Sequence, residues 1–155
     1  MGKVYRINID TVALLPAGRI EFNTLVIAKN GIKYVQDPSL NLIKSACFAY
    51  WGEYEGNRKA VIRHTNFIQK TPMPICKREG IYFFPTHSPH NIANGWIAFN
   101  HIANYDKIPP RLKTQQAQSI VYFKNGLTLP LSISYHTLKC QYERTYECIH
   151  LIEST

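Results

Sequence analysis

The sequence has 155 residues, of which 45% are hydrophobic and 12% aromatic, so it has the length of one domain and is too apolar for a disordered chain. Eighteen Lys and Arg against ten Asp and Glu give a formal net charge of +8, which indicates a polyanionic partner such as nucleic acid or an anionic membrane surface. The stretch 81–105 lacks charged residues, but its two prolines and four asparagines exclude a membrane helix, and because the N-terminus has no apolar signal-peptide core we expect a cytoplasmic protein.

Strand-forming residues dominate the first third of the chain. Val4–Ile9 alternates between polar and apolar residues, and Thr11–Leu15 is mostly apolar. Further on, an Asn-Gly pair at 30–31 lies between Thr24–Ala28 and Ile32–Val35. An Asn-Gly pair between two β-rich runs predicts a hairpin with a type I′ turn, because both central positions of that turn need positive φ.

The first helix is predicted to begin at Asp37-Pro38-Ser39, because Asp caps free amides and Pro fits the first helical turn. Gly52 is the expected stop. Between them, apolar residues follow at helical spacing and indicate a face packed in the core. This stripe consists of Leu40, Ile43, Cys47, Phe48, Tyr50 and Trp51.

The middle of the chain is predicted to be mainly extended. Glu53–Asn57 resembles a turn-rich connection, and Arg58–Gln69, which fits either a strand or a helix, is expected to be extended. Gly80–Pro85 and Gly95–Ala103 have the composition of buried strands. Asp106–Gln118 is polar and contains two adjacent prolines, so we expect a loop.

A second hairpin and a helix are expected at the C-terminal end. Ser119–Lys124 and Leu127–Leu131 flank another Asn-Gly pair. Ser134 is predicted to cap a helix whose apolar stripe consists of Leu138, Tyr142, Tyr146, Ile149 and Ile152. The fold class is therefore α+β: one β-rich mixed domain over residues 1–155, with two hairpins carrying Asn-Gly turns, one internal helix and a C-terminal helix.

The cations are concentrated in two segments without acidic residues. Residues 56–78 hold six Lys or Arg and residues 107–142 hold five, which favours a phosphate-binding surface. A solvated surface with salt bridges to other segments is the alternative, and it would be preferred for one such segment alone.

Eight residues are predicted to bind DNA. Arg58, Lys59 and Arg63 are expected to hold phosphates, as are Lys124 and Asn125 at the tip of the second hairpin. In the proline-containing loop, Arg111, Lys113 and Gln115 are residue types that enter a narrow A·T-rich minor groove, although a plain surface loop fits the sequence equally well.

His87, His90 and His101 raise the question of a metal site, but Pro89 breaks the helix that would align two ligands, and no carboxylate lies among them. We therefore predict no metal and no cofactor. The four cysteines form no CxxC pair and are expected to be free thiols. The sequence also lacks a nucleophile elbow, a Walker loop and a GxGxxG motif, so no enzyme activity and no catalytic residue is predicted.

Several segments resemble the competence transcription factor (ComK) family, in matching order and spacing from about Val12 to Thr145. They are Cys47-Phe-Ala-Tyr-Trp-Gly52, Tyr54-Glu-Gly-Asn-Arg58-Lys59-Ala60, Ile81-Tyr-Phe-Phe-Pro-Thr86 with Ser88, Gly95-Trp96-Ile97, and Asn125-Gly126 through Leu131-Ser-Ile-Ser134-Tyr135 to Gln141 and Arg144-Thr145. The chain resembles a short form without the C-terminal extension of longer members. Among the predicted site residues, Arg58 and Asn125 are the ones that the resemblance supports most directly.

The resemblance implies a sequence-specific DNA-binding activator of competence (DNA-uptake) genes. Such a protein binds A·T-rich boxes of double-stranded DNA through the minor groove and assembles as homodimers or higher oligomers, without a membrane partner. Two alternatives remain open: an interaction module or antagonist that pairs with a longer relative, and an RNA-binding protein. Salt-dependent binding of the purified chain to duplex DNA would distinguish the activator from the interaction module. A preference for single strands would instead indicate an RNA-binding protein.

Overall fold

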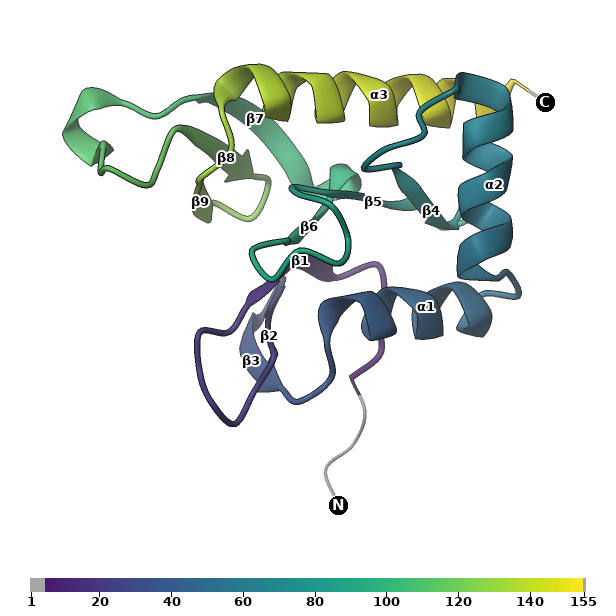
Figure 1. The fold of residues 1–155 in the computed structure, drawn as a ribbon, viewed down its shortest axis with the longest axis horizontal. Coiled ribbons are helices and arrows are strands. Elements are labelled where there is room, and N and C mark those ends of the chain that lie inside the picture. Colours follow the sequence, from purple (N-terminus) through teal and green to yellow (C-terminus); the bar gives the residue numbers. More distant parts are fainter. Residues whose placement is uncertain (1–4, 155) are drawn as a thin grey trace.

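The computed structural model describes residues 5–154, which form two antiparallel sheets and three α-helices (Figure 1). The α+β class is confirmed. The larger sheet has six strands in the order β3-β2-β1-β6-β5-β4. These are β1 (Thr11–Pro16), β2 (Thr24–Ala28), β3 (Gly31–Val35), β4 (Met73–Cys76), β5 (Ile81–Pro85) and β6 (Trp96–Ala98).

The smaller sheet has the order β7-β8-β9, with β7 (Ile102–Lys107), β8 (Ser119–Phe123) and β9 (Thr128–Leu131). The helices are α1 (Ser39–Ala49), α2 (Tyr54–Thr65) and α3 (Tyr135–Glu153), and two 3-10 turns are η1 (Phe99–His101) and η2 (Pro110–Leu112). In Figure 1, α3 runs along the top of both sheets, α2 stands at the right end and the β7–β8 connection projects at the left end. Within residues 5–154, no helix combines the length and apolar content needed to cross a membrane.

Two apolar clusters form the core, and β5 belongs to both. Phe83 belongs to the cluster that contains the buried side of α1, and Phe84 belongs to the cluster that contains Leu138 of α3. Successive residues of a strand point to opposite faces, so β5 is covered on both sides. This explains why its sequence is continuously apolar, with all five residues buried.

Both predicted hairpins are present, but the first turn is not the predicted type I′ turn. Ala28 pairs with Gly31, so Lys29 and Asn30 connect the strands, and neither has positive φ. In the second hairpin the side chain of Asn125 accepts a 3.1 Å hydrogen bond from the Leu127 N–H, and Gly126 has φ of 93°. Local side-chain bonding therefore sets the second turn.

The expectation of extended structure over Arg58–Gln69 is wrong, and so is the turn at Glu53–Asn57. Residues 54–65 form α2, and Asn66 ends it with a left-handed φ of 64° while its N–H bonds the Ile62 carbonyl at 2.7 Å. Asn at this position is a helix-stop signal. Packing of Tyr54 and Val61 in the interior fixes a helix that local propensity left ambiguous.

Several predicted boundaries also shift. Residues 5–8 form no strand where Val4–Ile9 was expected to, and Val4 lies outside the described residues. The segment Gly95–Ala103 is divided, since β6 ends at Ala98 and η1 turns the chain into β7 of the other sheet. The predicted loop Asp106–Gln118 begins only after Lys107.

The two helix starts behave differently. At α1, Pro38 rather than Asp37 occupies the cap position, and no side chain caps the helix. At α3, the predicted Ser134 cap is confirmed, because its hydroxyl accepts a 3.1 Å bond from the Thr137 N–H.

The predicted apolar stripes are partly wrong. Phe48 and Trp51 are 79% and 98% exposed, and Tyr146 of α3 is 61% exposed. Because α1 ends at Ala49 rather than near Gly52, Trp51 lies beyond the helix and outside the core.

Candidate nucleic-acid interface

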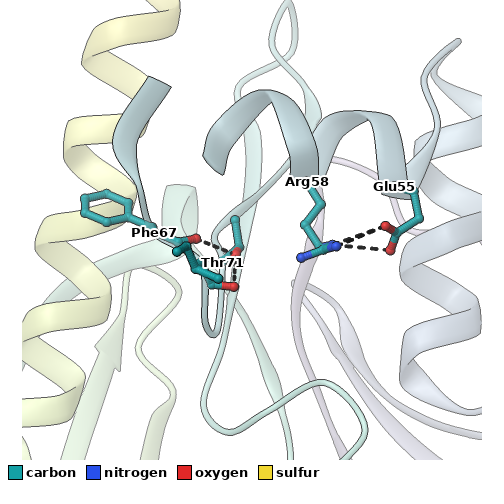
Figure 2. A network of polar contacts seen from close by, with 5 residues as sticks. Glu55, Arg58, Phe67 and Thr71 are labelled. Carbon is teal, nitrogen blue, oxygen red and sulfur yellow. Dashed lines mark hydrogen bonds and ion pairs between the residues drawn. The ribbon is translucent and has the colours of Figure 1, made fainter. Parts of the chain in front are cut away.

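The first group of predicted DNA-binding residues lies on α2, which places them on different faces of one helix. Lys59 and Arg63 are four residues apart, so both project from the same face, and both are exposed. Arg58 is turned away from them and donates from Nη2 to Glu55 at 3.1 Å (Figure 2). Lys59 and Arg63 are therefore the cations of α2 that a phosphate can reach without displacing Glu55.

The Glu55–Arg58 pair also affects both pKa values. The hydrogen bond to Glu55 raises the pKa of Arg58, and the same bond lowers the pKa of the Glu55 carboxyl. The two side chains are 32% and 50% exposed to water, so the pair contributes little to stability. A phosphate that binds Arg58 must compete with this carboxylate.

Arg58 borders a hollow of about 530 Å³ beside α2 that also contains Lys70 and His90. Lys70 has a left-handed φ of 50°, in a turn where the Thr71 hydroxyl donates to the Phe67 carbonyl at 2.6 Å (Figure 2). The sequence prediction did not name Lys70 as a site residue. Its only signal was the high cation count of residues 56–78, which gives no position in space.

The structure does not gather the three histidines into one cluster with other metal-ligating side chains within the described residues. The described part of the chain contains no group of three or more His, Cys, Asp or Glu side chains that could hold a metal ion. His87 accepts or donates a 2.8 Å hydrogen bond with the Thr86 hydroxyl, and burial together with nearby Lys70 lowers the pKa of its ring. The lowered pKa favours the neutral form of the ring.

The second group lies in the loop between β7 and β8, where Arg111, Lys113 and Gln115 are all exposed. The base of this loop is closed by a 3.2 Å bond from the Ile108 N–H to the Gln118 carbonyl. Pro109 and Pro110 restrict the backbone at the start of η2, which carries Arg111. The loop itself projects from the body of the molecule (Figure 1).

The third group is the tip of the β8–β9 hairpin, with Lys124 and Asn125. Both residues are exposed, and the Lys124 N–H bonds the His101 carbonyl at 2.9 Å, which fixes the tip against η1. The Asn125 oxygen is occupied by the Leu127 N–H, so only its amide nitrogen is left for a phosphate.

The structure thus divides the eight predicted residues among three places. The α2 group and the β7–β8 loop lie at opposite ends of the long axis of the molecule (Figure 1). One phosphate cannot contact both groups.

Comparison with known proteins adds family evidence. The sequence model of the family described as ComK protein matches residues 3–155. A competence transcription factor of Bacillus subtilis (strain 168) is 28% identical over 144 residues, which cover 91% of this chain and 71% of the relative. No solved structure matches the chain.

Proposed function

The chain belongs to the ComK family, and from this membership we propose that it is a competence transcription regulator, with residues 1–155 acting as one DNA-binding domain. The role is that of a transcription factor and not of an enzyme. In this proposal the protein activates DNA-uptake genes by binding A·T-rich boxes of double-stranded DNA through the minor groove, as a homodimer or higher oligomer. It works in the cytoplasm, where the chromosome lies.

The exposed β7–β8 loop is the observation that supports minor-groove binding most strongly. Arg111, Lys113 and Gln115 carry donors that suit the acceptors on the floor of an A·T-rich groove. A loop stiffened by Pro109 and Pro110 loses less conformational entropy when it is ordered on DNA.

The other cations support contacts to the DNA backbone. Lys59 and Arg63 form an exposed pair on α2, and Lys124 projects from a hairpin tip held by backbone hydrogen bonds. Phosphate contacts of this kind position a protein without reading sequence. Because α2 and the loop lie at opposite ends of the molecule, we propose that they contact separate stretches of duplex.

Competition binding tests this function directly. The purified chain is titrated with fluorescent A·T-rich and G·C-rich duplexes of equal length at one salt concentration, with and without a small minor-groove ligand. We expect tighter binding to the A·T-rich duplex and displacement by the ligand. Equal affinity for the two duplexes would contradict minor-groove readout, and preference for single-stranded RNA would favour the RNA-binding alternative.

The antagonist alternative is tested separately. If the chain binds no duplex alone but pairs with a longer relative, the interaction-module hypothesis is supported instead.

A further inference from the structure

Trp51 occupies a backbone position that normally favours glycine. The Trp51 N–H bonds the Phe48 carbonyl at 3.1 Å, and the Gly52 N–H bonds the Cys47 carbonyl at 2.8 Å. These two bonds form a Schellman motif at the end of α1, and Trp51, with φ of 70°, is its left-handed residue. A side chain at this position strains the backbone, and glycine does not.

The Trp51 side chain also contributes nothing to the core, since it is 98% exposed. Neither the backbone nor the interior therefore accounts for a tryptophan here. A large aromatic ring held in water by a strained backbone is typical of a residue that packs against a partner.

Trp51 lies on the rim of a cavity of about 600 Å³ that no predicted DNA-binding residue lines. Its walls come from α2, β4 and the C-terminal end of α3, and its apolar surface includes Val61, Ile75 and Leu151. One edge of α2 faces the cavity through Asn57, Ala60, Val61, His64 and Thr65, a spacing that forms a single helical stripe.

The cavity is held in shape by a polar link between two of its walls. The Asn57 amide donates to the Pro74 carbonyl at 2.9 Å and so joins α2 to β4. Gly52 packs against this amide so closely that a Cβ there would lie 3.0 Å from Asn57 Oδ1. The cavity is therefore built into the fold, with its shape set before any partner binds.

The charges around the cavity indicate what it binds. Lys77 and Arg78 line it and no carboxylate is among the lining residues, while the Glu79 carboxylate lies just outside, 4.0 Å from the Sγ of the lining Cys76. We propose that this cavity is a docking site for a segment of a partner protein that has an apolar face and acidic flanks. The apolar residues of the segment would fill the cavity beside Trp51, and its carboxylates would face Lys77 and Arg78.

Two other occupants fit the surface less well. A second copy of this chain would bring the same cationic rim against itself, which opposes association. A nucleic acid would match the charge of Lys77 and Arg78, but the apolar part of the wall, which includes Val61, Ile75 and Leu151, offers a phosphate chain no hydrogen-bond donors.

The site is separate from the proposed DNA contacts, and this inference does not depend on them. Lys59 and Arg63 project from the face of α2 opposite to the stripe that lines the cavity. Variants can therefore remove one surface and keep the other.

Tryptophan fluorescence provides a direct test, because the chain has two tryptophans and Trp96 is fully buried. The probe is a synthetic amphipathic helical peptide with leucines on one face and glutamates on the other. A version with lysine for every glutamate, and one with serine for every leucine, are the controls. We expect the acidic peptide, and neither control peptide, to bind in anisotropy measurements and to shift Trp51 emission to shorter wavelength.

Three variants locate the binding. Trp51→Ala is expected to weaken peptide binding by roughly tenfold or more. Lys77→Glu with Arg78→Glu should abolish binding of the acidic peptide and favour the lysine version. Phe48→Ala removes an exposed aromatic residue near the end of α1 that does not line the cavity, and it should leave affinity unchanged.

Four results would overturn the proposal. The first is that the acidic peptide does not bind, and the second is that the lysine version binds equally well. The third is an emission shift that follows protein concentration in the absence of peptide. The fourth is displacement of the peptide by single-stranded DNA. The third result would identify a second copy as the occupant, and the fourth a nucleic acid.

Discussion

Arg111 stands on a 3-10 turn that begins at Pro110, directly after Pro109, and its side chain is exposed to solvent. An A·T tract narrows the minor groove and strengthens its negative potential, so an inserted guanidinium gains more there than in G·C sequence. The guanine amino group further obstructs the groove floor of G·C pairs. If Arg111 reads DNA, its contribution must therefore depend on base composition.

We predict that Arg111→Ala weakens binding to A·T-rich duplexes more than to G·C-rich duplexes, with a difference of roughly 1–3 kcal/mol. Titration of both duplexes by fluorescence anisotropy measures this difference. Lys124→Ala is the matched control, since loss of a phosphate contact should weaken both duplexes equally. An equal loss for Arg111→Ala would assign the loop to phosphate binding and leave readout to another element.

Trp51 lowers the local stability of the fold through its own backbone conformation. We predict that Trp51→Gly raises the free energy of unfolding by about 1 kcal/mol, because glycine relieves the left-handed backbone at the end of α1. Urea unfolding followed by circular dichroism measures the change. Trp51→Ala removes the ring but keeps the strained Cβ, so it should stabilise less. A loss of stability in the glycine variant would show that the exposed ring packs on the fold.

At the scale of elements, a buried polar network joins α3 to the turn after α2. Gln141 is 1% exposed, and its amide donates to the Lys70 carbonyl at 3.0 Å and to the Pro85 carbonyl at 2.8 Å. Its oxygen accepts a 2.7 Å bond from Arg144, which also bonds the Gln69 carbonyl and lies over the Phe67 ring. One side chain therefore holds three elements in place.

Gln141→Leu is expected to lower the free energy of unfolding by about 2–4 kcal/mol, since it leaves a buried carbonyl and part of a guanidinium without partners. Thermal and urea unfolding check this value. Lys139→Leu, on the exposed side of the same helix, controls for helix propensity and should change stability by less than about 0.5 kcal/mol. A Gln141→Leu variant as stable as the parent would mean that the network is replaced by apolar packing without loss.

Some elements were predictable because their signals are local. The Ser134 cap and the second Asn-Gly turn depend on residues within one turn of the chain, and the structure contains both. Helix α2 was not predictable in this way, because its apolar residues fit two periods and contacts with β4 and α3 select the helix.

The candidate site, too, was predictable only where local sequence signals determine it. The exposure of Arg111, Lys59 and Lys124 follows from composition and turn signals. Their distribution over three separate places, with α2 and the β7–β8 loop at opposite ends of the molecule, depends on tertiary structure. The importance of Trp51 was also hidden, because an aromatic residue at helical spacing indicates a core position unless the helix end is known.

On the scale of the whole molecule, the cations predicted to bind DNA are divided among separated groups, with α2 and the β7–β8 loop at opposite ends (Figure 1). Groups far apart with no shared partner act additively, so Arg111 and the α2 pair should contribute independently to binding. The total electrostatic contribution then depends on how many phosphates the whole surface neutralises.

We predict that duplex affinity falls ~10³-fold between about 50 and 200 mM salt, the value for about six neutralised phosphates. Lys59→Ala with Arg63→Ala should reduce the slope of log K against log salt by about one per residue and leave the A·T preference unchanged. Arg58→Ala should reduce it less, because Glu55 already pairs with this cation. Equilibrium titrations at four or more salt concentrations supply these slopes. A flat salt dependence in the parent protein, or a slope that the α2 variants leave unchanged, would remove α2 from the DNA interface.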